Sequence, residues 1–208
     1  MISFPRATEV RKLLPKNAFY RNLNLSQKLK DSFVSDIENI YVVNSLRNDN
    51  LNLNSFSDVK EILVLSLTVR KAEINKKILE AIAQQNPHKL LFILNFDEDQ
   101  RLAVYYRKLY QSNWMDPNDL QLEIQGTSLD EIWKGIIEQI AIEEKLPERA
   151  THLNLDQKLE IQAKILELKE LINKKEKAIK KEMQPKKQYE MYKELQKYQK
   201  ELEDMLNG

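Results

Sequence analysis

Apolar residues follow two different periods in the middle of this chain. Residues 62–69 and 90–94 are almost continuously apolar and rich in branched side chains, which is typical of strands covered on both faces. Between them, residues 74–82 carry isoleucine at every fourth position, and this spacing predicts a helix that ends before Pro87. The alternation predicts the core of the protein, with residues 62–69 in the middle of a sheet.

Two helices are predicted before this core. A short one is expected over residues 8–14, with Thr8 as its N-cap and Pro15 as its stop. A longer one begins after Ser26 and gives way to a strand over residues 40–43, whose β-branched and aromatic residues favour that structure. The predicted core face of the longer helix consists of Leu29, Phe33, Ile37 and Ile40.

Further strands and one more helix are predicted after the core begins. Residues 89–96 and 101–109 should be two strands, and the short acidic loop between them predicts an antiparallel hairpin. Residues 120–125 alternate as another strand, and Ser128 with Glu131 forms a predicted capping box for a helix. The core face of that helix consists of Leu129, Ile132, Trp133, Ile136, Ile137 and Ile140.

The chain after residue 155 is dominated by leucine, isoleucine, glutamate, lysine and glutamine. Apolar residues recur there in steps of four and three on both sides of Pro185, which predicts two amphipathic helices. An antiparallel hairpin is the simplest arrangement, and its longer arm would reach about 40 Å. Pairing within one chain and pairing between two chains, as in a homodimer, both satisfy the pattern. The two seams consist of Ile161, Ile165, Leu168, Ile172 and Ile179, and of Met191, Leu195, Tyr198, Leu202 and Met205.

These elements together predict an α+β fold. We expect a mixed or antiparallel sheet of about five strands with flanking helices, followed by a C-terminal antiparallel helical (coiled-coil) hairpin. The α+β domain, with a basic N-terminal strap, is assigned to residues 1–147 and the hairpin to residues 153–208. A chain of 208 residues is long enough for one core and such an appendage.

The composition excludes several kinds of chemistry. The absence of cysteine excludes disulfides, thiolate metal sites and thiol nucleophiles, and it fits a cytoplasmic location. The three glycines, Gly126, Gly135 and Gly208, cannot supply a P-loop or a dinucleotide-binding fingerprint. His88 and His152 lie far apart with loop-like neighbours, so neither is expected to bind a metal or act as a base. No cofactor, metal or catalytic residue is expected.

Charge is balanced over the whole chain but clustered locally. The net charge of +1 gives no global reason to expect nucleic acid or a membrane, and no run of about 18 apolar residues is present to span one. Basic residues nevertheless gather around Pro185, at the tip of the predicted hairpin, and in the N-terminal strap. Each cluster is either a solvated surface or a contact surface for phosphates or an acidic protein. The tip carries Lys174, Lys175, Lys177, Lys180, Lys181, Lys186 and Lys187, and the strap carries Arg6, Arg11, Lys12, Lys16 and Arg21.

Carboxylates give only weak signs of metal chemistry. Residues 97–99 are acidic but fit no calcium-loop spacing, so a solvated hairpin turn is predicted there. The order of elements over residues 26–96 is similar to that of a restriction-endonuclease-like core, in which Asp49 or Asp58 would be the first acidic ligand. The long strand has neither an acid nor a lysine at its middle, and Glu61 is not followed two positions later by lysine. An active nuclease of that kind is therefore not expected.

Several segments spread over nearly the whole chain resemble one family. They are Pro5-Arg6-x-Thr8-Glu9-Val10 with Pro15-Lys16, the helix at 33–40, the strand at 59–69, the strand Lys89-Leu90-Leu91-Phe92-Ile93-Leu94 and the arm at 187–202. In these segments the chain resembles a bacterial family known only as domain of unknown function 4391. The resemblance implies that its relatives are encoded beside helicases and DNA methyltransferases in restriction-like or phage-defence gene clusters. It carries over no catalytic residues.

Three functions follow from these observations as hypotheses. The first is a non-catalytic accessory subunit of an anti-phage defence or restriction-like complex, which docks a larger DNA-acting protein, such as a helicase or methyltransferase, through its hairpin. The second is direct nucleic-acid binding through the strap and the hairpin tip. The third is a degenerate restriction-endonuclease-like nuclease. The accessory subunit is favoured by the absence of a recognisable set of catalytic residues, by the apolar seams and by the family resemblance.

Overall fold

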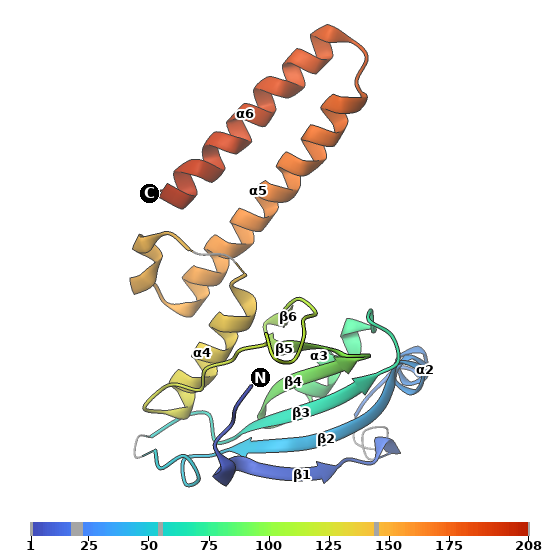
Figure 1. Ribbon diagram of the computed structural model, residues 1–208, viewed down its shortest axis with the longest axis vertical. Helices are drawn as coiled ribbons and strands as arrows, with labels where there is room; N and C mark the ends of the chain where they lie inside the picture. The colour runs from blue at the N-terminus through green and yellow to red at the C-terminus, as the bar shows by residue number, and fades with distance from the viewer. Residues whose placement is uncertain (1, 18–22, 54–55, 144–145, 208) are drawn as a thin grey trace. The chain divides into compact units, whose positions relative to one another are not determined.

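The computed structural model describes residues 2–17, 23–53, 56–143 and 146–207. The chain divides into two compact units, Met1–Ala141 and Ile142–Gly208. In Figure 1 the strands of the first unit run from blue to green, and the two long helices of the second unit are orange and red. None of the helices in these described ranges is both long and apolar enough to cross a membrane.

The first unit is built on a six-stranded sheet whose strands lie in chain order. Neighbouring strands are antiparallel except β3 and β4, which are parallel because a helix, α3, connects them. The strands are β1 (Glu9–Leu13), β2 (Ile37–Leu46), β3 (Ile62–Val69), β4 (Lys89–Phe96), β5 (Asp99–Tyr106) and β6 (Lys108–Gln111). The predicted α+β class with a mixed sheet is thereby confirmed, with six strands where about five were expected.

β3 and β4 form the centre of the sheet, as their apolar runs predict. Both strands have the predicted bounds, and Leu67 of β3 pairs with Leu94 of β4. Two helices, α2 (Gln27–Asp36) and α3 (Lys76–Gln84), join the same buried core. The core of these four elements includes Phe33, Leu65, Leu67, Ile78, Leu79, Ile82, Phe92 and Leu94.

The second predicted helix begins where expected but ends earlier than its apolar pattern indicates. Ser26 caps α2, and its side chain accepts a hydrogen bond from the Leu29 amide. The helix ends at Asp36, and Ile37 and Ile40, which were assigned to its core face, are buried from β2 instead. A helix and a strand would each bury Ile37 and Ile40, so the periodicity of these few residues could not distinguish the two structures.

Asp36 fixes the junction between α2 and β2. Its carboxylate accepts hydrogen bonds from Lys71 Nζ at 2.9 Å, from the Ser35 hydroxyl at 2.6 Å and from the Asn75 amide at 3.2 Å. Its backbone carbonyl accepts a further bond from the Arg70 amide. Asp36 is almost completely buried, and it ties the end of α2 to the connection between β3 and α3.

The helix predicted over residues 8–14 is wrong, because Glu9–Leu13 form the edge strand β1, which is antiparallel to β2. Thr8 is not an N-cap. It closes a short 3-10 turn, η1 (Arg6–Thr8), by donating its hydroxyl to the Pro5 carbonyl at 2.7 Å, and it accepts a hydrogen bond from Asn44 at 2.8 Å. A helix of so few residues is not stable in isolation, so pairing with β2 decides the structure.

The strands after β4 also differ from the prediction. β4 and β5 form the expected antiparallel hairpin, but the strand predicted over 101–109 is divided at Arg107, whose φ of 61° turns the chain into β6. Residues 120–125 form no strand. Instead, the side chain of Gln139 donates to the Glu123 carbonyl at 2.9 Å and accepts from its amide at 2.8 Å. An amide side chain thus supplies the bonds that a neighbouring strand would have made.

The last helix of the first unit, α4 (Leu129–Ala141), packs against β5 and β6. All six residues of its predicted core face are buried. Ser128 caps it by accepting a bond from the Glu131 amide at 3.2 Å, while Asp130 accepts bonds from the amides of Asp58 and Val59. The start of α4 therefore anchors the segment that leads into β3.

Candidate functional site

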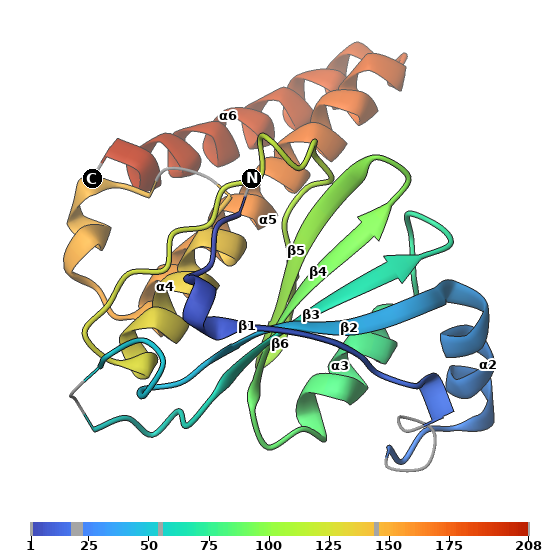
Figure 2. The same ribbon diagram turned by 60° about the horizontal axis from the view of Figure 1, so that its bottom comes forward.

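The second unit contains a helical hairpin made of α5 (Leu155–Lys181) and α6 (Pro185–Asn207). The two helices are antiparallel, because Lys164 pairs with Glu201 at 3.4 Å while Lys175 pairs with Glu194. They lie side by side in Figure 1 and in Figure 2. The predicted antiparallel hairpin is confirmed, and its apolar seam closes between two helices of one chain. Of the predicted seam residues, Ile165, Leu168 and Leu195 are buried, and the other seven are half-buried.

Both ends of α5 carry local signals that the sequence encodes. Asn154 and Gln157 form a capping box at the start, each side chain accepting a bond from the other residue's amide. At the other end, the Glu182 amide donates to the Ala178 carbonyl at 3.1 Å, and α6 begins directly at Pro185. Proline is favoured at the first position of a helix because its missing N–H is not needed there. The tight turn leaves Met183 91% exposed.

The structure divides the seven lysines predicted at the tip into two groups. Lys174 pairs with Glu170 at 3.3 Å and Lys175 pairs with Glu194. The hydrogen bond between Lys175 and Glu194 raises the pKa of Lys175 and lowers the pKa of Glu194, so both remain charged near neutral pH. The other five are exposed and have no carboxylate partner among the residues that the structure describes. We call these five the tip lysines: Lys177, Lys180, Lys181, Lys186 and Lys187.

Large side chains lie exposed close to the tip lysines in sequence. Tyr189 is 60% exposed and Tyr192 is 50% exposed, whereas Tyr198 is half-buried in the seam, as its position in the pattern predicts. Lys193 Nζ lies 4.7 Å from the centre of the Tyr189 ring. The hairpin end therefore combines apolar and aromatic surface with uncompensated positive charge.

Sequence reasoning missed three further exposed lysines, Lys193, Lys197 and Lys200. They follow Lys186 by seven, eleven and fourteen positions, and a helix places residues at these spacings on one face. The signal was present in the sequence. It could not be separated from an ordinary solvated helix surface until the partners of the neighbouring glutamates were known.

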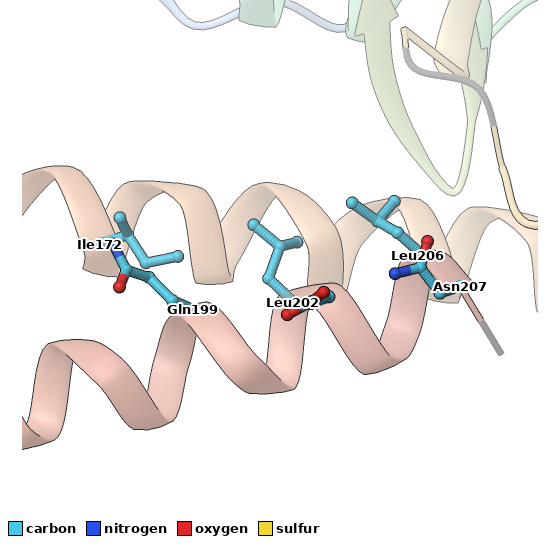
Figure 3. Close-up of a pocket in the computed structure, with 6 residues that line it drawn as sticks. Ile172, Gln199, Leu202, Leu206 and Asn207 are labelled. Carbon is cyan, nitrogen blue, oxygen red and sulfur yellow. The ribbon is translucent and has the colours of Figure 1, made fainter.

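A shallow groove of about 350 Å³ lies along the side of the hairpin. Figure 3 shows that residues of both helices line it, with Leu202 and Leu206 from α6 and Ile172 from α5. Gln199, Glu203 and Asn207 complete its wall. The groove is open, and Glu203 is the titratable side chain among these lining residues.

The N-terminal strap does not present its basic residues as one surface. Arg11 pairs with Glu9 at 3.2 Å, and Lys16 Nζ donates to the Ile37 carbonyl. Burial of Lys16, followed by the nearby charge of Arg70, lowers the pKa of Lys16. Of the predicted strap residues, Arg6 and Lys12 are exposed and have no ion pair among the described residues, and Arg21 lies outside the described residues.

Two of the acids considered in the nuclease comparison, Asp49 and Glu61, contact other side chains. Asp49 pairs with Arg47 at 3.4 Å, and Glu61 accepts a hydrogen bond from Ser45 and lies 3.2 Å from His88 Nδ1. Asp58 is exposed beside the start of α4. Within the described parts of the chain, no three histidine, aspartate or glutamate side chains gather as a metal site would require. The contact between Glu61 and His88 was not predicted, because the two residues meet only through the pairing of β3 with β4.

The fold and the hairpin define the chain as an α+β protein with a C-terminal helical hairpin. It belongs to the family described as Domain of unknown function (DUF4391), whose pattern matches residues 2–202. No curated protein matches the chain, and no solved structure matches it. The family match includes nearly all of α6, so the hairpin belongs to the family pattern together with the sheet.

Proposed function

We propose that this protein is a non-catalytic accessory subunit that docks a larger DNA-acting protein through the end of its helical hairpin. One observation carries the proposal. The hairpin buries its own seam, yet it leaves Met183, Tyr189 and Tyr192 exposed next to the five tip lysines. These exposed side chains are not needed to hold α5 and α6 together, so they are available for contact with another molecule.

The chemistry of this end indicates what the partner surface would be. Tyrosine is enriched among the residues that carry most of the energy of protein interfaces, and Met adapts to irregular apolar pockets. Complete burial of Met183 would contribute about 1.5–3 kcal/mol. Lysines around these side chains would contribute orientation and association rate more than affinity. The expected partner surface is an apolar pocket with an acidic rim.

The kind of partner follows from the family resemblance. The resemblance implies that relatives are encoded beside helicases and DNA methyltransferases in defence or restriction-like gene clusters. The expected partner is therefore a helicase or a DNA methyltransferase. A subunit without catalytic groups of its own would then position or regulate such an enzyme.

Truncating the exposed side chains at the hairpin end is expected to release the partner. The tagged chain would be co-expressed with its neighbouring genes, and the partner would be identified by mass spectrometry. In a variant carrying Met183→Ala and Tyr192→Ala, recovery of a helicase or methyltransferase should fall more than about tenfold, since two interface side chains together contribute more than about 1.4 kcal/mol. Both residues are exposed, so the fold should be unaffected.

A matched control is available in the first unit. Phe56 is 86% exposed and Tyr41 is 39% exposed, and a variant carrying Phe56→Ala and Tyr41→Ala removes a similar amount of apolar surface. This variant should retain the partner. Equal retention by the hairpin variant, or partner binding by a chain that lacks residues 155–208, would contradict the proposal.

A further inference from the structure

Four exposed lysines lie on one face of α6, and we call them the α6 lysine stripe: Lys186, Lys193, Lys197 and Lys200. At 100° per residue, their directions fall within about 60° of one another around the helix axis. They extend over about 21 Å at 1.5 Å per residue. The buried residue Leu195 points to the opposite side, because it belongs to the seam with α5. The stripe is therefore the outward face of the hairpin's second helix.

The glutamates that would neutralise this stripe are turned toward α5. Glu194 lies one position after Lys193 and pairs with Lys175, and Glu201 lies one position after Lys200 and pairs with Lys164 at 3.4 Å. The two carboxylates next to the stripe thus form their ion pairs with lysines of the other helix, although, in addition to the hydrogen bond from Lys175, the charge of Lys197 helps to lower the pKa of Glu194. The outward face therefore has no ion pair of its own with these two glutamates.

Two acids remain on the outward face, Glu190 and Asp204, and both are exposed. Each lies four positions after a stripe lysine, which is the less favourable order for a helical ion pair, and Glu190 also lies three positions before Lys193. Within the described residues, neither is paired with a lysine. Four lysines against two carboxylates leave a net positive charge along the face.

We infer that the α6 lysine stripe binds the phosphate backbone of nucleic acid. Lysine is depleted in protein–protein interfaces, and a protein partner would need a larger apolar centre than the single ring of Tyr189 gives this face. Interfaces with nucleic acid are more polar and much more positively charged. A linear row of cations over about 21 Å matches a linear polyanion, since a duplex presents about twelve phosphates over that length.

The aromatic ring next to the stripe supports this assignment. Tyr189 lies on the same face between Lys186 and Lys193, and its ring is held 4.7 Å below the Lys193 ammonium. This contact restricts Lys193 to the outward face and lowers the entropy that it would lose on meeting a phosphate. No base contact is built into the stripe, so binding should not depend on nucleotide sequence.

The inference extends the proposed docking function, and the two surfaces share Lys186 and Tyr189. The docking test changes Met183 and Tyr192, whereas the stripe can be tested at Lys193 and Lys197, which are not tip lysines. Loss of partner docking and loss of nucleic-acid binding can therefore be observed separately. A chain that binds its partner but not DNA would overturn this inference and leave the proposed function in place.

The experiment measures binding of the full chain to fluorescein-labelled DNA of about 20 nucleotides, single-stranded and duplex, between about 50 and 200 mM salt. If four lysines each neutralise one phosphate, the logarithm of the duplex affinity should fall against the logarithm of salt with a slope of about −3.6. The affinity should then decrease about 100-fold over this range. For single strands the expected slope is about −2.8. Binding of either form supports the inference.

The variant carrying Lys193→Gln and Lys197→Gln should halve the salt slope, and Lys193→Glu with Lys197→Glu should abolish binding at about 200 mM salt. Lys76→Glu with Lys77→Glu, two exposed lysines of α3, makes the same change in net charge and should bind like the natural chain. Absence of salt-dependent binding, equal loss in the α3 control, or equally tight binding of polyglutamate would overturn the inference. Circular dichroism of each variant verifies that the helices remain folded.

Discussion

Replacing Leu195 by alanine is expected to free α6 from α5. Leu195 is the buried residue of α6 and is 5% exposed. Leu→Ala changes at buried sites cost about 2–5 kcal/mol, because transfer energy and packing are both lost. The remaining seam residues of α6 are half-buried, and most of the stability of a helix in a protein comes from the packing of its apolar face. The amides of α6 should therefore exchange hydrogen at least about 30-fold faster.

Hydrogen–deuterium exchange followed by mass spectrometry gives this measurement for each helix separately. Leu171→Ala on α5 is the matched control, because Leu171 is exposed and its truncation should change stability by at most about 0.5 kcal/mol. Faster exchange in the control than in Leu195→Ala would show that the seam lies elsewhere. If only Leu195→Ala opens the hairpin, binding assays with that variant also show whether the exposed side chains bind only when the hairpin is closed.

Replacing Asp36 by asparagine is expected to lower the free energy of unfolding by about 2–3 kcal/mol near neutral pH, as loss of hydrogen bonds to a charged group does. The carboxylate accepts bonds from Lys71, Ser35 and the Asn75 amide, and asparagine cannot accept all of them. Because Lys71 is half exposed, most of this cost comes from the buried hydrogen bonds and not from the ion pair. Urea unfolding gives the value directly.

The same site gives the chain a predictable response to acid. Burial of Asp36 raises its pKa, but the bonds from Lys71, Ser35 and Asn75 outweigh burial and hold the pKa below its ordinary value. The unfolded chain then binds a proton more readily than the folded chain. The stabilisation is complete above the ordinary aspartate pKa of about 4 and is lost as the pH falls through the lower folded pKa.

The difference in stability between the natural chain and Asp36→Asn should therefore shrink as the pH falls below about 4. Asp31→Asn on the same helix is the control, because Asp31 is exposed and its carboxylate accepts one bond from Gln27 at 2.8 Å. That variant should lie within about 0.5 kcal/mol of the natural chain. A constant difference between the natural chain and Asp36→Asn at all pH values would refute the assigned role of Asp36.

The hairpin and the central strands were predictable because their signals are long or unambiguous. The seam residues of α5 and α6 repeat over several turns, and Pro185 marks the break between them. The apolar runs of β3 and β4 gave the bounds of both strands. The tip lysines could be named from composition, but the ion pairs of Lys174 and Lys175 required the register of α5 against α6.

Short segments were predicted poorly because local preference did not decide them. Residues 9–13 became a strand through pairing with β2, and in the segment at 120–125 the backbone of Glu123 bonds to the side chain of Gln139. Sequence spacing also gave no indication that Glu61 and His88 would meet. These outcomes depend on residues far away in the chain, which local patterns do not contain.

The sequence by itself determined the class of the protein: apolar periods specify two buried strands with a helix between them, and heptad-like seams around a proline specify two helices. Tertiary structure decided which strands complete the sheet and which charges remain available on the hairpin. The reason is that a carboxylate can neutralise only the cation that the fold places beside it. Glu194 and Glu201 face α5, so the lysines on the outward side of α6 keep their charge.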